Sequence, residues 1–248
     1  LYPLPVAIHR ILLEDLAPQI GVRIVIGGDE AHHAARVKRS EVGDPINLLN
    51  GRGLHASAVI RDIRKSRQGT WELEVEVTSI TIEERAGPRI EVLAAAAKGD
   101  RLEEMIDGLS QVGADAYRPL LTRRTVVDPR EGKMNRLRRV AAESLKQCGR
   151  GWLLEIEDAI TFAEAIKPTP GTLVLAADAS GASLPASAVA PADRVVLLVG
   201  PEGGFSDEEF AQLKAAGVTL FRFAPHVLRV ETAAVVGAAM IRTLPSPR

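Results

Sequence analysis

The chain has 248 residues, 46% hydrophobic and 25% charged, which is the composition of an ordinary globular protein of one or two domains. A formal net charge of −1 argues against a nucleic-acid binder that is basic over its whole surface. The single cysteine, Cys148, excludes an internal disulfide framework and predicts a reducing, cytoplasmic location. We expect no transmembrane helix, no secretion signal within residues 1–10 and no metal site, because none of the corresponding patterns occurs.

The first third of the chain is predicted to be mostly β. Residues 71–80 alternate between apolar side chains such as Trp71 and Leu73 and intervening glutamates, as expected for a half-buried strand. Further strands are expected at 23–26, 45–49 and 54–60, and a short helix at 30–37. Several short strands at this spacing predict a small barrel. The basic residues in this part are candidates for RNA phosphate contacts, although ordinary surface charge explains them better on sequence alone: Arg10, Arg36, Lys38 and Arg39.

A polar segment at 83–88 ends the β pattern, and we place a domain boundary there, giving domains 1–82 and 83–248. After it, strands alternate with helices, which predicts an α/β domain with a mainly parallel sheet. The expected strands are 90–97, 117–121 with an extension through 122–127, 172–176, 195–199 and 219–223. The expected helices follow Asp100, span 133–148, and begin after Thr161, after Ser206 and near Thr232.

Positive charge gathers between Arg118 and Arg150, where ten basic residues face only three acidic ones. A local basic surface on a nearly neutral protein can hold a polyanion in one orientation. A solvated helix face explains such a run equally well.

The most informative stretch is RVVLLVGPEGGFSDEE at 194–209. An apolar strand runs into a glycine turn and then a helix, whose start combines a Ser206–Glu209 capping box with a Phe205–Phe210 hydrophobic staple. In open α/β sheets, ligands bind at such carboxyl ends of strands. The turn matches neither the phosphate-binding P-loop nor the dinucleotide fingerprint, and a tight connection without any ligand explains it equally well.

A second motif, HVLRVETAA at 226–234, precedes a helix of small apolar residues that Thr232 or Glu231 is expected to open. Arg229 and Glu231 lie between apolar residues, where an unpaired charge is costly to bury. They are therefore either a structural ion pair or functional groups.

Together, GPEGGFSDEE at 200–209 and VLRVETAA at 227–234 resemble the ribosomal RNA small subunit methyltransferase E family, of the SPOUT class of knotted methyltransferases. The likeness continues through HHAARVKRSEVGD at 32–44, which is similar to the family's PUA-like RNA-binding barrel. It extends to Arg123-Arg124 and to QCGR at 147–150. The chain departs from the family where Gly108 and Gln111 replace a usual Lys and Glu, and where Lys146 replaces a usual Glu.

The resemblance implies a PUA-like β-barrel followed by a SPOUT α/β domain with a deep trefoil knot. It also implies a homodimer that uses S-adenosyl-L-methionine to methylate N3 of one uridine, U1498, in 16S rRNA of the small ribosomal subunit. The cofactor would be bound by three loops, with these candidate contacts: Ala176, Val199, Gly200, Pro201, Glu202, Gly203, Gly204, Val227, Leu228, Val230, Thr232 and Ala233.

Two residues are the catalytic candidates. Arg229 would stabilise charge on the uracil oxygens, and Glu231 would orient Arg229 or accept the N3 proton. Structural roles for Glu231 and Glu202 remain open. The RNA-binding candidates are Arg10, Arg36, Lys38, Arg39, Arg123, Arg124 and Arg150.

Three other functions remain open at this stage. The chain is alternatively a SPOUT enzyme that acts on another nucleotide, or a non-catalytic RNA-binding protein with a relict cofactor pocket. A nucleotide-binding α/β protein is disfavoured by the missing P-loop lysine.

Overall fold

The computed structural model describes residues 8–67, 69–85, 87–126, 129–183, 186–189 and 192–244. Residues 1–7, which belong to the stretch considered for a secretion signal, lie outside this description. The chain forms two compact units. The first comprises the chain up to Glu84 together with Lys146–Trp152, and the second comprises Arg85–Leu145 and Leu153–Arg248.

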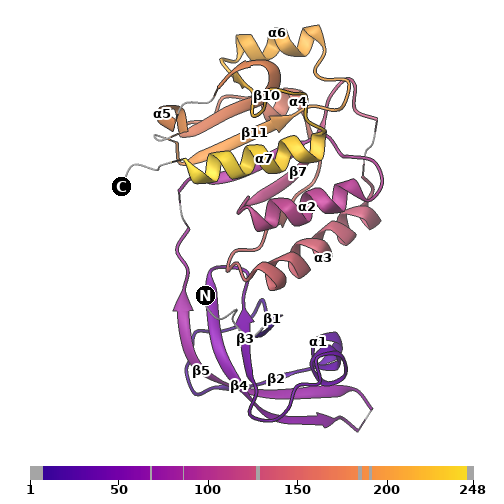
Figure 1. Cartoon of the computed structure of the whole chain (residues 1–248), viewed down its shortest axis with the longest axis vertical. Helices are drawn as coiled ribbons and strands as arrows, with labels where there is room; N and C mark the ends of the chain where they lie inside the picture. Colours follow the sequence, from indigo (N-terminus) through magenta and orange to yellow (C-terminus); the bar gives the residue numbers. More distant parts are fainter. Residues whose placement is uncertain are drawn as a thin grey trace. The chain divides into compact units, whose positions relative to one another are not determined.

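The first unit is built on a five-stranded mixed sheet with the order β1-β3-β4-β5-β2 (Figure 1). β1 pairs in parallel with β3, and the other pairings are antiparallel. The strands are β1 His9–Leu12, β2 Arg23–Ile26, β3 Pro45–Leu49, β4 Leu54–Lys65 and β5 Trp71–Ile82. All four predicted strands are present, and the predicted helix is α1 Gly28–His32 followed by the π-helical turn η1 His33–Val37.

The alternation predicted for β5 is confirmed. Leu73, Val75 and Val77 are buried in the core of the first unit, and the glutamates between them lie on the other face of the sheet. On that face Glu76 accepts a hydrogen bond of 3.0 Å from Arg61 of β4. One face of the sheet therefore encloses the core while the other carries cross-strand ion pairs.

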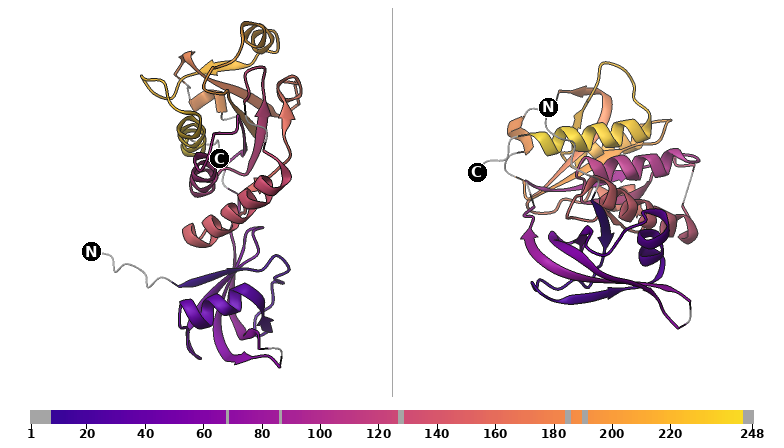
Figure 2. Two further views of the ribbon diagram at one scale, coloured as in Figure 1. Left: turned by 90° about the vertical axis from the view of Figure 1, so that its right-hand side faces the viewer. Right: turned by 60° about the horizontal axis from the view of Figure 1, so that its bottom comes forward.

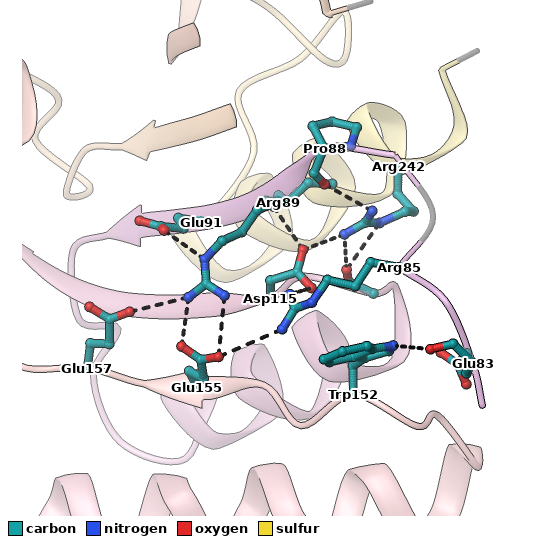
Figure 3. A network of polar contacts seen from close by, with 12 residues as sticks. Glu83, Arg85, Pro88, Arg89, Glu91, Asp115, Trp152, Glu155, Glu157 and Arg242 are labelled. Atoms are coloured by element: carbon teal, nitrogen blue, oxygen red, sulfur yellow. Dashed lines mark hydrogen bonds and ion pairs between the residues drawn. The ribbon is translucent and has the colours of Figure 1, made fainter. Parts of the chain in front are cut away.

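A segment distant in sequence completes the first unit. Gly53 donates a backbone hydrogen bond of 2.9 Å to Gly151, and Gly151 in turn donates to the Glu83 carboxylate at 2.9 Å. The Trp152 indole donates to the Glu83 carbonyl at 3.0 Å, as Figure 3 shows. These contacts are the reason why Lys146–Trp152 belongs to the first unit, a feature that no local pattern in the sequence indicates.

The second unit contains a sheet with the strand order β12-β10-β11-β6-β7-β8, with β9 also paired to β7. Every pairing between its described strands is parallel, as the alternation of strands and helices predicted. The strands are β6 Arg89–Ala94, β7 Ala116–Leu121, β8 Glu155–Ile156, β9 Ile160–Thr161, β10 Thr172–Ala182, β11 Arg194–Val199 and β12 Thr219–Phe221.

Helices cover both faces of this sheet. α2 Arg101–Gln111, part of α3 Glu131–Cys148 and α7 Val230–Thr243 pack on the face that carries Val195 and Leu197 of β11. α4 Phe162–Ala165 and α6 Asp207–Ala215 pack on the face that carries Val196 and Leu198. A short helix, α5, spans Ala186–Val189. Figure 2 shows α2 and α7 side by side on one side of the strands. The continuous apolar run of β11 follows from this double burial.

Several predicted boundaries were wrong. The strand expected at 172–176 continues to Ala182, and the strand expected at 219–223 ends at Phe221. The expected extension of the second strand through 122–127 is instead a turn, in which Thr125 donates a backbone hydrogen bond of 3.1 Å to Thr122. Val127 itself lies outside the described residues. The first strand of the α/β unit ends at Ala94 rather than at 97. The chain leaves the sheet at its carboxyl edge after Ala94 and after Leu121. Beyond these residues, contacts within the loops decide the backbone conformation, and the apolar pattern of the sequence no longer predicts it.

A polar network joins elements at the opposite, amino edge of this sheet (Figure 3). Asp115, whose side chain is 4% exposed, accepts hydrogen bonds of 2.7 Å from Arg85 and 2.6 Å from Arg242. Arg89, at the start of β6, pairs with Glu155 of β8 at 2.7 Å. Arg85 and Arg242 thus tie the segment before β6 and the last turn of α7 to the buried Asp115 carboxylate, and the separate Arg89–Glu155 pair joins the starts of β6 and β8.

The first unit should lose stability in mild acid because of His9. Burial, and then the nearby charges of His33, Lys38 and Lys146, lower the pKa of His9 from 6.5 to about 4. Below about pH 6.5 the His9 side chain therefore binds a proton in the unfolded chain but not in the folded one, until the pH approaches 4. The free energy of unfolding is thus highest above pH 6.5 and declines as the pH falls toward 4.

Both tryptophans, Trp71 and Trp152, belong to the first unit, so their fluorescence in urea titrations reports on it. His9→Phe should flatten the decline in stability between pH 7 and pH 5, and the exposed His32→Gln should leave it unchanged. An equally steep decline in His9→Phe would show that other groups cause it.

Candidate functional site

A cavity of about 510 Å³ opens at the carboxyl edge of the second sheet. Its walls come from β10, at the point where its pairing with β12 shifts register, and from the ends of β11 and β12 with the segments that follow them. The wall comprises 177–179, 199–205, 221–224, 226–230 and Ala233. Since these three parallel strands are neighbours in the sheet, the topology brings the distant segments together at its carboxyl edge.

The glycine turn after β11 forms one wall. Gly204 has a φ of +70° and donates a backbone hydrogen bond of 2.8 Å to Pro201. A side chain at residue 204 would strain this left-handed conformation. The turn therefore presents main chain to the cavity.

The start of α6 fixes the turn in place, as the sequence predicted. Ser206 accepts a hydrogen bond of 3.2 Å from the Glu209 N–H, and the Glu209 carboxylate accepts one of 2.8 Å from the Ser206 N–H. The rings of Phe205 and Phe210 lie 5.9 Å apart, edge to face. The capping box and the hydrophobic staple are thus both confirmed.

The same carboxylate reaches a second loop. The other oxygen of Glu209, which is 6% exposed, accepts a hydrogen bond of 2.8 Å from the Arg123 N–H in the turn after β7. Next to it, the Arg124 guanidinium donates to the carbonyls of Gly203 at 2.6 Å and Phe205 at 3.1 Å. The turn at 122–125 therefore supports the glycine turn in two ways. Its main chain binds Glu209 at the start of α6, and its Arg124 side chain binds carbonyls of the glycine turn itself.

The third wall requires a close approach of two strands. β10 pairs with β12 through a register shift between Ala177 and Ala182. A Cβ atom at Gly181 would lie 2.4 Å from the Phe221 backbone, so only glycine fits there. Phe221 packs edge to face on Phe223, with ring centroids 4.3 Å apart. The contact between the two rings fixes the chain where it leaves β12 and enters the cavity wall.

The start of α7 completes the cavity and corrects a prediction. The helix begins at Val230 with Arg229 as its N-cap, one or two residues before the predicted Glu231 or Thr232. Arg229 has extended backbone at φ −68° and ψ 157°, which directs the chain into the cavity wall. Its side chain is exposed, and we find no ion pair or hydrogen bond to its guanidinium within the described ranges.

The Arg229–Glu231 ion pair considered from the sequence does not form. Glu231 is 13% exposed, and one of its oxygens lies 3.6 Å from Nη1 of Arg101, the first residue of α2. Its other oxygen is buried and has no hydrogen-bond partner among the residues described. Arg101 also lies 3.9 Å from Glu202 of the glycine turn, so it is a residue near the site that the sequence did not indicate.

Comparisons with known proteins agree with this architecture. A model of the RNA methyltransferase domain matches residues 84–242, and a model of the RNA methyltransferase PUA domain matches residues 26–67. Ribosomal RNA small subunit methyltransferase E of Synechocystis is 30% identical over 92% of this chain and 76% of its own length. The Mycobacterium tuberculosis protein of the same name is 30% identical over 94% of this chain and 90% of its own.

This chain belongs to the ribosomal RNA small subunit methyltransferase E family. Among solved structures, the family member from Neisseria gonorrhoeae, bound to S-adenosyl methionine, superposes with a TM-score of 0.84 at 22% identity, covering 96% of this chain and 98% of that one. A Legionella pneumophila protein in complex with the cofactor SAM gives 0.80 at 25% identity, with the same coverage. The predicted family and fold class, PUA-like followed by SPOUT-type α/β, are confirmed.

The structure gathers most of the residues that the family resemblance marks for the cofactor. Ala176 and Thr232 are outside the cavity wall, since Ala176 is buried in β10 and Thr232 is exposed on α7. The remaining ten candidates line it. The wall also includes residues that were not among the twelve cofactor candidates: Ala177, Asp178, Ala179, Phe205, Phe221, Arg222, Phe223, Ala224 and His226. The family resemblance places one cofactor loop directly after Ala176, and the first three of these residues lie there, although in the structure they belong to β10 and not to a loop.

The RNA-binding candidates separate between the two units. In the first unit, Arg36, Lys38 and Arg39 are exposed at or just after η1. Arg10 instead donates hydrogen bonds of 3.0 Å to the carbonyls of Lys146 and Gln147 at the end of α3. Arg150 is partly buried in the same unit. Arg123 and Arg124 belong to the second unit, where Arg123 pairs with Glu208 at 3.0 Å.

None of the helices in the described part of the chain has the length and the apolar character that a membrane span requires. The same part of the chain contains no group of three or more His, Cys, Asp or Glu residues placed to hold a metal ion.

Glu209→Ala should destabilise the second unit by about 2–3 kcal/mol, because it removes the capping box and leaves the Ser206 and Arg123 N–H groups without their acceptor. Chemical unfolding followed by far-UV circular dichroism would measure the loss. Glu208→Ala is the matched control, since the Glu208 side chain is 64% exposed, and it should cost less than about 1 kcal/mol. Equal losses in the two variants would contradict the role given to Glu209.

Proposed function

We propose that this protein transfers a methyl group from S-adenosyl-L-methionine to N3 of a uridine in 16S rRNA, at the family target U1498. The observation that supports this best is the cavity that residues of the two family motifs, 200–204 and 227–230 with Ala233, form together with residues 177–179 of β10. The two solved relatives that are described as bound to the same cofactor have this fold.

The cavity suits such a cofactor in size and chemistry. Its volume of about 510 Å³ lies within the usual range of roughly 300–1,000 Å³ for small-molecule pockets. Apolar side chains such as Val199 and Leu228 would pack on an adenine, and the main chain of 200–204 would bind its polar edges. When bound, S-adenosyl-L-methionine supplies an electrophilic methyl group.

Arg229 is our candidate for stabilising the methyl acceptor. Uridine N3 carries a proton at neutral pH, and its loss places negative charge on O2 and O4. The Arg229 guanidinium lies on the cavity wall at the amino end of α7. Its own positive charge and the positive end of the helix dipole would both stabilise that negative charge. Stabilising the anion would let the proton leave without a strongly basic side chain.

The acidic residues receive indirect roles in this proposal. Glu231 is not part of the cavity wall and lies against Arg101, so orientation of neighbouring charge fits its position better than proton transfer. Glu202 lines the cavity with a side chain that is 51% exposed, and we propose that it contacts the cofactor.

RNA binding is proposed for the basic residues of both units. Arg36, Lys38 and Arg39 form an exposed cationic surface beside His9, whose lowered pKa reflects in part the positive charges of Lys38 and Lys146. Such a surface attracts phosphates and fixes their register. The proposed set is completed by Arg10, Arg123, Arg124 and Arg150. Several of these side chains contact main-chain carbonyls or a carboxylate in the structure, and RNA phosphates would share or replace those contacts.

Further expectations are carried forward as proposals. The family resemblance supports the trefoil knot in the α/β domain, assembly as a homodimer and action on the small ribosomal subunit. The polar segment at 83–88 supports the domain division at 82/83, and the single cysteine supports a cytoplasmic location.

Mapping methylated nucleosides in 16S rRNA tests the proposed function directly. Cells that lack the gene should lose 3-methyluridine at position 1498, and the wild-type gene should restore it. Loss of a different methylated nucleoside would indicate another target, and no loss at all would favour a non-catalytic RNA-binding protein.

Arg229→Ala should lower kcat by about 10²- to 10³-fold, the effect expected from removing one donor to a developing oxyanion. Calorimetry should show that its Kd for the cofactor stays within about threefold of the wild-type value, because the turn at 200–204 is unchanged. Arg67→Ala is the control, as Arg67 is an exposed arginine outside the cavity wall, and both values should stay within about twofold of the wild type. Comparable losses of kcat and cofactor affinity in Arg229→Ala would assign Arg229 to cofactor binding.

A further inference from the structure

Arg101 lies where three segments around the cavity meet. It opens α2, and its guanidinium lies between a carboxylate from α7 and one from the glycine turn. Nη1 is 3.6 Å from an oxygen of Glu231, and Nη2 is 3.9 Å from an oxygen of Glu202. The Arg101 side chain is 33% exposed, so water screens these two attractions only in part.

The two carboxylates that Arg101 engages also belong to the surroundings of Arg229. Glu202 lines the same cavity as Arg229, and Glu231 follows Arg229 by two residues. An arginine that is paired with a carboxylate has its donors occupied and most of its field cancelled. Nevertheless Arg229 has no ion-pair partner among the described residues, whereas both glutamates lie within 4 Å of Arg101.

We propose that Arg101 is a positioning residue that keeps Arg229 available: it holds Glu202 and Glu231, so that the Arg229 guanidinium stays free for an anionic acceptor. The identity of that acceptor rests on the proposed function. Without Arg101, two carboxylates would surround one arginine, and the local charge would oppose a developing anion. A purely structural Arg101 would tie α2 to α7 without affecting Arg229.

Chemical labelling separates these two accounts without any RNA. Phenylglyoxal modifies unpaired guanidinium groups faster than paired ones, and peptide mass spectrometry gives the rate for each arginine. Arg101→Met should slow the labelling of Arg229 at least threefold, because a freed carboxylate then pairs with it. Arg222, on the same wall, should keep its rate and serves as the internal control. Arg101→Gln provides a second neutral variant if Arg101→Met folds poorly.

Reversal by a second substitution is the sharper test. Labelling of Arg229 should recover at least twofold when Arg101→Met is combined with Glu202→Gln or Glu231→Gln, and Arg101→Lys should label within twofold of the wild type. In methyl-transfer assays, Arg101→Met should lower kcat at least tenfold. At least one of the double variants should exceed Arg101→Met in kcat by threefold or more.

The inference would be overturned by an unchanged Arg229 labelling rate in the folded neutral variant, or by double variants that recover neither labelling nor turnover. A wild-type protein that methylates no RNA would overturn the proposed function instead. The labelling rates would still decide the role of Arg101 in that case.

Discussion

The cavity at the carboxyl edge of the second sheet depends on one buried carboxylate. Glu209 accepts hydrogen bonds of 2.8 Å from the Ser206 N–H and of 2.8 Å from the Arg123 N–H, and it thereby joins the start of α6 to the turn after β7. Buried N–H groups are costly without acceptors, so both loops have one favourable arrangement around this side chain. The glycine turn lies between them, and Arg124 binds two of its carbonyls. A loop with little side-chain packing of its own is thus given a fixed shape.

Features encoded by neighbouring residues were predictable from the sequence. The strand, turn and capped helix at 194–215 follow from apolar run length, glycine conformation and side chains three to five residues apart. The convergence of β10 with the segments after β11 and β12 follows from parallel topology, which the alternation of strands and helices indicates. Family resemblance added the cofactor and the reaction, which no local pattern specifies.

Contacts between distant residues were not predictable in this way. Nothing near Arg101 indicates that it meets carboxylates 101 and 130 positions further along the chain, at Glu202 and Glu231. Gly108 is similar: it stands where the family usually has lysine, and a Cβ there would lie 2.8 Å from a methyl group of Val235 on α7. The close packing of α2 on α7 thus gives this departure from the family pattern a physical reason.

The central claim is that two segments remote in sequence, 200–204 and 227–233, form one pocket for a methyl donor. A crystal structure of the protein grown with saturating S-adenosylhomocysteine tests this most directly. The account predicts ligand density in the cavity at the ends of β10, β11 and β12, in contact with both segments. Density at another place, or a structure in which the two segments lie apart, would contradict it.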